Sequence, residues 1–416
     1  MDASQQAAVQ AARHSYGRLL ATLAYQWRDI AAAEDALAEA FAAALAHWPH
    51  TGVPRSPDAW LTTAAKRNLL RAARHQRVVL DPAVTVLLEQ CETSDGTESS
   101  TIPDERLRLM LVCAHPEIDA DVRTPLMLQV VLGLEARQIA SALLLKPATL
   151  AQRLVRAKTR IRESGLRFEL PQAEDLAARS HAVLDAVYGA YTLGWHHTAL
   201  DSPSTQTELA SEALFLAELC ASLLPAKSPA SAEALGLLAL LWFCEARRDA
   251  SLGPGGEFVP LHQQDTARWN IAQVGLAETT LRQAFALGSP GPYQLEAAIQ
   301  SAHCERLRGE AVPWEGIVLL YEQLLAMAPT TGAQLGHAVA VAESLGATAG
   351  LNLLQHLSVD TLVSCQPYWV TRAHLLAQTG ALVEAQSAYA RAIGLTENPA
   401  IRRHLMEVMG RLCAIA

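Results

Sequence analysis

Two stretches of the sequence carry rows of positively charged side chains that suit a polyanion. Residues 60–77 hold five Lys or Arg and no acid, and residues 146–167 hold seven Lys or Arg against one Glu. Between them, residues 78–104 hold six carboxylates and no Lys or Arg. Because cationic side chains bind phosphates, two separate rows on one chain predict two contacts with a long nucleic acid, which here means DNA.

The second row lies on an expected helix over residues 148–163. Its apolar residues repeat every three or four positions and predict a buried stripe of Leu150, Leu154, Ala157 and Ile161. The polar side chains left on the other faces are Gln152, Arg153, Arg156 and Arg160. A short expected helix over 135–144 and a Lys-Pro turn precede it, and this helix-turn-helix pattern is typical of major-groove binding. A solvated helix face is the alternative interpretation.

The first row combines cations with an amide that could bond to a base edge: Lys66, Arg67, Asn68, Arg71 and Arg74. A proline-bounded loop over 49–57 precedes it and could accept an unstacked base, as binding of single-stranded DNA requires. Upstream, Glu34, Asp35 and Glu39 lie mostly off the apolar stripe of their helix. For these acids, a docking site for a basic partner and ordinary solvation are equally supported.

Local signals predict where the N-terminal helices begin and end. Asp29 is a candidate N-cap for a helix that runs to Trp48 and ends at Pro49, with Leu37, Phe41, Leu45 and Trp48 as its buried stripe. Ser56 and Pro57 suit the start of the next helix. Thr124 and Pro125 are expected to open a later helix.

The C-terminal part reads as a long series of helices. Gly346 and Gly380 lie 34 residues apart, which is the tetratricopeptide period. That pattern is followed by Trp369, Ala373, Gly380, Ala385, Tyr389, Ala392 and Pro399. An irregular stretch, 247–269, interrupts the helices. Its polar residues Arg247, Arg248, Asp249, Asp265 and Arg268, with Trp269, suit either a regulatory contact or a plain connecting loop.

Composition narrows the classes of function. The chain has 416 residues and a net charge of −9, but residues 1–170 carry +1 and residues 171–416 carry −10, so the second part is better suited to protein contacts. Seven scattered cysteines give no zinc or disulfide pattern, and we expect no metal and no cofactor. The sequence has no apolar segment of membrane-spanning length, no N-terminal signal and no phosphate-binding or nucleophile motif, which predicts a soluble, cytoplasmic protein that is not an enzyme.

The chain resembles the bacterial extracytoplasmic-function sigma factors, in the subgroup that has a large C-terminal tetratricopeptide-like domain. The resemblance is carried by AEDALAEAF at 33–41, HWP at 47–49, PDAWL at 57–61, AAKRN at 64–68, IPDERLRL at 102–109 and TLAQRLVRAK at 149–158, and it continues at 246–269, 292–299 and 338–343. It implies an all-α protein: sigma region 2 over 1–77, an acidic linker over 78–101, a helix-turn-helix sigma region 4 over 102–170, and a helical-repeat domain over 171–416.

The resemblance also implies roles for particular residues. Glu34, Asp35 and Glu39 would dock on core RNA polymerase, and Lys66, Arg67, Asn68, Arg71 and Arg74 would contact the minus-ten element. Thr149, Gln152, Arg153, Arg156 and Arg160 would contact the minus-thirty-five element. The C-terminal domain would control activity, with a small YCII-like protein as a further partner. The alternative is a helix-turn-helix regulator with a repeat domain that never binds polymerase.

Overall fold

The computed structural model describes residues 3–77, 104–143, 145–164, 173–196, 203–357, 362–396 and 398–413. These residues form helices and loops, with one isolated bridge between Leu252 and Phe258, so the predicted all-α class is confirmed. Two compact units divide the chain, Met1–Ala190 and Tyr191–Ala416. The expected acidic linker over 78–101 lies outside the described residues.

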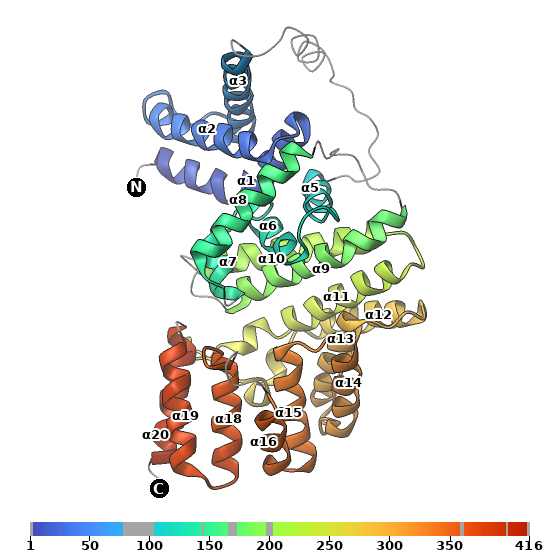
Figure 1. The fold of residues 1–416 in the computed structure, drawn as a ribbon. Helices are drawn as coiled ribbons and strands as arrows, with labels where there is room; N and C mark the ends of the chain where they lie inside the picture. The colour runs from blue at the N-terminus through green and yellow to red at the C-terminus, as the bar shows by residue number, and fades with distance from the viewer. Residues whose placement is uncertain are drawn as a thin grey trace. The chain divides into compact units, whose positions relative to one another are not determined.

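The first unit is built from eight helices within the described residues, the last of which runs on past its boundary (Figure 1). They are α1 (Ala3–Trp27), α2 (Ile30–Thr51), α3 (Pro57–Arg77), α5 (Glu105–Cys113), α6 (Ala120–Val130), α7 (Ala136–Ala142), α8 (Pro147–Glu163) and α9 (Ala173–His196). The start of α9 belongs here, since Arg179 Nη1 donates to the Leu111 carbonyl at 3.2 Å and Gly189 lies beside Leu128. The first unit therefore includes the described part of α9 up to Ala190.

Helix α1 lies at the centre of the first unit. Leu20, Ala21, Leu23 and Ala24 are each fully buried, because α1 packs against α2 and α3 on one side and against α5 and α6 on another. Apolar side chains on several faces of one helix are typical of a helix surrounded by others. The packing of the whole unit therefore depends on this segment.

Three local expectations about α2 and α6 were wrong. Helix α2 runs past Pro49 to Thr51, because a proline in the last turn removes only its own N–H, and Gly52, with φ +84°, ends the helix. Leu45 is 48% exposed, since the small residues Ala33, Ala36, Ala40 and Ala44 form the buried face together with Leu37 and Trp48. Helix α6 begins at Ala120 and contains Pro125 in its interior.

The second unit is a run of helices with an irregular stretch near its start. Its elements are α10 (Pro203–Leu223), α11 (Pro229–Glu245), η1 (Arg248–Ser251), η2 (Leu261–Gln263), η3 (Thr266–Arg268), α12 (Ile271–Ala286), α13 (Pro292–His303), η4 (Cys304–Arg308), α14 (Trp314–Met327), α15 (Thr331–Leu345), α16 (Ala347–Gln355), α18 (Gln366–Gln378), α19 (Leu382–Leu395) and α20 (Pro399–Cys413). In Figure 1, α18, α19 and α20 lie side by side.

The later helices of this unit stack through a chain of small cores. One core joins α13, α14 and α15 around Ile317 and Leu324, the next joins α15, α16 and α18 around Tyr368, and the last joins α18, α19 and α20 around Tyr389. Each core joins three neighbouring helices, a packing that is typical of helical-repeat arrays. The tetratricopeptide assignment itself stays a prediction.

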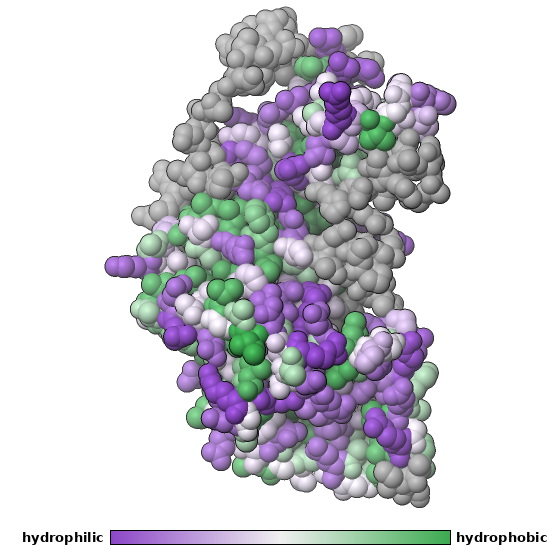
Figure 2. Space-filling model, turned by 180° about the vertical axis from the view of Figure 1, so that it is seen from behind, coloured by the Kyte–Doolittle hydropathy of each residue, from purple (hydrophilic) through white to green (hydrophobic). Residues whose placement is uncertain are grey.

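The helices described here are too short or too polar for a membrane span. On the face drawn in Figure 2, exposed hydrophobic side chains form patches among hydrophilic ones.

Candidate functional site

Helix α3 presents cations because its buried face is narrow. Leu61, Ala65 and Leu69 recur every four residues and are buried, which turns the basic positions outward. Arg67, Arg71 and Arg74 are exposed, and Lys66 is half-buried. As expected, the helix begins at Pro57, with Ser56 Oγ accepting from the Ala59 N–H at 3.4 Å. The arrangement leaves three guanidinium groups available to phosphates.

Asn68 has a structural contact that the sequence did not indicate. Its Nδ2 donates to the carbonyl oxygen of Ala36 on α2 at 3.2 Å, and the side chain is half-buried. The hydrogen bond joins α3 to α2, in addition to the packing of their buried faces. This donor is already engaged, so the amide is not simply presented to a base edge.

The acidic residues of α2 fall into two environments. Asp29 caps the helix as expected, accepting from the Ala32 N–H at 3.0 Å. Asp35 and Glu39 are exposed, one turn apart. Glu34 is half-buried, and its carboxylate accepts from Nζ of Lys158 on α8 at 2.7 Å. The sequence grouped these three acids, and the structure leaves only two of them open to solvent.

Helix α8 is amphipathic as predicted. Leu150, Leu154, Ala157 and Ile161 are its buried residues, which confirms the stripe. The polar positions Thr149, Gln152, Arg156 and Arg160 are exposed. Arg153 is half-buried and forms a 2.7 Å ion pair with Asp121 on α6. Helix α7 precedes α8 and packs against it, and a capping box between Glu135 and Gln138 closes the start of α7.

In the irregular stretch of the second unit, several of the singled-out residues make local contacts. Arg248 donates through Nε to Glu245 at 2.9 Å, and its guanidinium carbon lies 4.4 Å from the centre of the Trp195 ring. Arg268 donates to the carbonyls of Leu252 and Asp249. Asp265 caps η3 through the Ala267 N–H at 3.0 Å. These contacts explain why the segment keeps a defined path without regular helix.

Arg247 and Trp269 form the centre of a buried polar cluster. Arg247 is 7% exposed and Trp269 is 3% exposed, and Arg247 Nη2 donates to Gln300 Oε1 at 2.5 Å. Two guanidinium carbons lie near the Trp269 ring centre, that of Arg247 at 5.7 Å and that of Arg306 at 5.5 Å. Such cation–π contacts stabilise buried cations. Arg306 and Gln300 were missed in the sequence because no spacing rule links them to residues more than 30 positions earlier.

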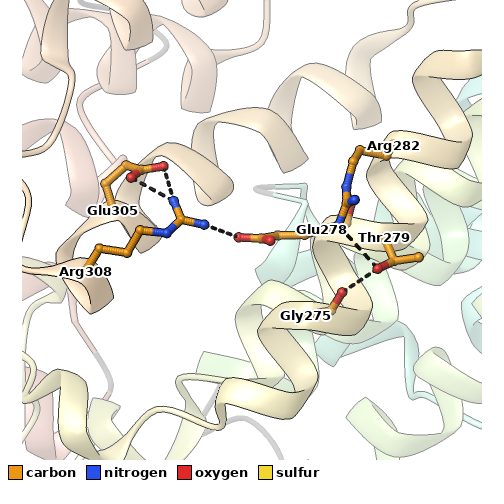
Figure 3. Close-up of polar contacts among 6 residues, drawn as sticks. All are labelled: Gly275, Glu278, Thr279, Arg282, Glu305 and Arg308. Atoms are coloured by element: carbon orange, nitrogen blue, oxygen red, sulfur yellow. Dashed lines mark hydrogen bonds and ion pairs between the residues drawn. The ribbon is translucent and has the colours of Figure 1, made fainter.

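Ion pairs of Arg308 hold η4, the segment that carries Arg306 of the cluster, against α12 (Figure 3). Arg308 on η4 forms ion pairs with Glu305 at 2.8 Å and with Glu278 on α12 at 3.5 Å. On the same helix, the Thr279 hydroxyl donates to the Gly275 carbonyl at 2.8 Å, and Arg282 Nη2 lies 3.5 Å from that hydroxyl. Because Arg308 is well exposed, these pairs fix geometry more than they add stability.

The buried thiols of the described residues are poorly suited to catalysis. Burial raises the pKa of Cys113 and of Cys220 to about 12, and that of Cys304 to about 11. A thiol with so high a pKa is a poor nucleophile at neutral pH. Within the described ranges, no three His, Cys, Asp or Glu side chains are grouped to hold a metal ion.

Two protein families match parts of this chain. Residues 13–78 match the family described as Sigma-70 region 2, and residues 179–285 match DUF6596, a family of unknown function. The chain is 34% identical over 394 residues to the uncharacterized protein R00370 of Rhizobium meliloti (strain 1021), covering 93% of this chain and 92% of that protein.

A second relative carries a function in its name. The chain is 32% identical over 161 residues to the probable RNA polymerase sigma factor RfaY of Xanthomonas campestris pv. campestris, covering 37% of this chain and 38% of that protein. No solved structure matches the chain. The chain belongs, over nearly its whole length, to the same family as the Rhizobium protein, and its residues 13–78 carry the match to Sigma-70 region 2.

The buried cluster predicts a pH dependence of stability. Burial, with the positive charges of Arg247 and Arg306, lowers the pKa of His303 from 6.5 to about 4. Below pH 6.5 the unfolded chain therefore binds a proton that the folded chain does not, so stability falls as the pH is lowered from 6.5 to 4. We expect His303→Gln to remove a slope of up to about 1.4 kcal/mol per pH unit.

Urea unfolding followed by tryptophan fluorescence at several pH values between 6.5 and 4 measures this slope. Burial also lowers the pKa of His337, His374 and His404. The difference in slope between the variant and the wild-type chain therefore gives the contribution of His303 alone. Equal slopes for the two proteins would show that His303 is not held neutral.

Proposed function

We propose that the chain is a sigma factor that binds core RNA polymerase and directs promoter-specific initiation of transcription. The observation that carries the proposal is the separation of charge within the stretch that matches region 2. Exposed acids, Asp35 and Glu39, lie on α2, and exposed cations, Arg67, Arg71 and Arg74, lie on α3. One helix can then meet a basic protein surface while the next meets DNA.

We assign minus-ten contact to Lys66, Arg67, Arg71 and Arg74, and we assign Asn68 chiefly the positioning of α3 through its bond to Ala36. We assign contact with the minus-thirty-five element to four exposed residues of α8, which are Thr149, Gln152, Arg156 and Arg160. Arg153 can join them only by sharing or leaving its ion pair with Asp121. Exposed positions near the N-terminus of α8 are those that a groove-bound helix offers to base edges.

We assign the second unit the role of a control module. Its sequence is strongly acidic, which disfavours DNA and favours protein contacts. Stacked helices with small sequential cores present extended surfaces for partners, and a small YCII-like protein is one candidate. The cluster of Arg247 and Trp269 would transmit such contacts within the unit. In this role the chain is a binding protein and not an enzyme.

Charge reversal on α2 tests polymerase docking. We expect the double change Asp35→Lys and Glu39→Lys to lower affinity for core polymerase at least about ten-fold, because like charges then face each other across the interface. Promoter-dependent transcription should fall accordingly, while binding to isolated minus-thirty-five DNA should not change.

The control is Glu117→Lys, which changes an exposed acid outside the docking helix. Filter binding and run-off transcription with core polymerase supply the two measurements. If the α2 variant transcribes normally, the chain is instead a DNA-binding regulator that does not use this surface to engage polymerase.

Alanine substitution on α8 tests DNA reading. Arg156→Ala and Gln152→Ala should each weaken minus-thirty-five DNA binding by about 1 to 3 kcal/mol, through loss of bonds to bases or phosphates. Arg162→Ala, an exposed cation near the C-terminal end of the same helix, is the control and should cost less. Equal losses for Arg156→Ala and Arg162→Ala, with no loss for Gln152→Ala, would indicate general charge attraction without base reading.

A further inference from the structure

The two cations beside the Trp269 ring bond to neutral acceptors. Arg247 donates to the side-chain amide oxygen of Gln300. Arg306 donates through Nη1 and Nη2 to backbone carbonyls of residues 261–264. Among the residues that the structure describes, neither guanidinium forms an ion pair with a carboxylate. Burial of a cation without a counter-charge is costly, and the face of an indole ring offsets that cost only in part.

Neighbouring groups respond to this positive charge. Burial and the charges of the two arginines lower the pKa of His303 to about 4. Two nearby carboxylates, those of Glu278 and Glu305, pair with Arg308. Their negative charge is thus matched by a third arginine, and the two guanidinium groups beside the ring are not neutralised by direct contact.

Three buried polar atoms of the cluster have no hydrogen-bond partner among the described protein atoms. They are Arg247 Nη1, Trp269 Nε1 and Gln264 Oε1, and their residues are 7%, 3% and 8% exposed. Arg306 connects Gln264 to the ring, because it donates to the Gln264 carbonyl at 2.9 Å and its guanidinium carbon lies 5.5 Å from the centre of the Trp269 ring. A buried polar group without a partner costs free energy, so a group that supplies two acceptors and one donor is favoured here.

A hydrogen phosphate ion has the charge and the hydrogen-bonding groups that match this set. Its two negative charges equal the charge of the two guanidinium groups, and guanidinium and indole N–H groups donate to phosphate oxygens. Its single hydroxyl can donate to Gln264 Oε1. A chloride ion has no donor for that atom, and a water molecule carries no charge to balance the arginines. Sulfate has the same charge and shape but no hydroxyl, which makes it a sensitive comparison.

We propose that Arg247, Gln264, Trp269 and Arg306 form a binding site for inorganic phosphate. Three of these side chains come from the irregular stretch and the fourth comes from η4, so a bound ion would join the two segments. A ligand that binds only the folded chain stabilises the fold. The site lies within the second unit. The inference goes beyond the proposed function and is tested without polymerase.

Isothermal titration calorimetry of the purified full-length chain with inorganic phosphate measures the binding. The titration is made at mildly alkaline pH, where the doubly charged ion predominates, and at constant ionic strength. We expect one phosphate to bind per chain. Sulfate should bind at least about ten-fold more weakly, because it leaves Gln264 Oε1 without a donor. Glycerol 3-phosphate, whose doubly charged form also lacks a hydroxyl on phosphorus, should bind more weakly than the free ion.

Two substitutions test the location of the site. Arg247→Gln removes one charge and Nη1, and Trp269→Phe keeps an aromatic ring but removes the indole N–H. We expect phosphate affinity to fall at least about ten-fold for Arg247→Gln and about three- to ten-fold for Trp269→Phe. The matched control is Arg308→Gln, which removes a neighbouring arginine that pairs with two glutamates and should change the affinity by less than about two-fold. Circular dichroism verifies that each variant is folded.

The titration of the wild-type chain decides the inference even where a variant fails to fold. Absence of saturable binding overturns the phosphate site, and so does equal affinity for phosphate and sulfate, which would indicate general attraction of anions. Unchanged affinity in both site variants also overturns it, because the ion then binds elsewhere on the chain. Selective binding of phosphate that both site variants weaken, and that Arg308→Gln preserves, supports the site. The experiments with core polymerase test the sigma role separately.

Discussion

Burial of α1 is the interaction on which the first unit depends. Its Leu20 and Leu23 are fully buried, and the helix touches both the α2–α3 pair and the α5–α6 pair. Removing a fully buried leucine side chain typically costs about 2 to 5 kcal/mol, so this helix can organise two sets of neighbours at once. Gly17 sets how closely one of those sets approaches.

This packing determines which charges remain available. The narrow buried faces of α3 and α8 leave most of their cations in solvent, where they are free for phosphates. Glu34 on α2 pairs with Lys158 on α8. Burial, together with the negative charge of Glu34, raises the pKa of Tyr16. Exposed and paired charges thus follow directly from helix packing.

The sequence predicted the features that depend on local pattern. The cap at Asp29, the helix start at Pro57 and the buried stripe of α8 follow from residue type and spacing, and the structure confirms them. Leu45 was misassigned because an alanine-rich helix can pack closely through its small residues, which a stripe of large residues does not anticipate. The contacts of α9 with α5 and α6 join residues far apart in the sequence, which local pattern does not predict.

Contacts between distant residues could not be predicted. Nothing near Lys158 or Glu34 marks them as partners, and Arg306 joins Trp269 only through the folding of η4 beside η3. The resemblance to sigma factors assigned roles to exposed residues, and the match over residues 13–78 supports the family. It carried no information about which of those residues are paired within the chain.

Incubation of the purified full-length chain with core RNA polymerase, followed by transcription from a genomic fragment library, tests the central claim most directly. The account predicts a one-to-one complex with polymerase and transcripts that begin at a defined set of promoters. A chain that neither associates with core polymerase nor directs it to any start site would contradict the account.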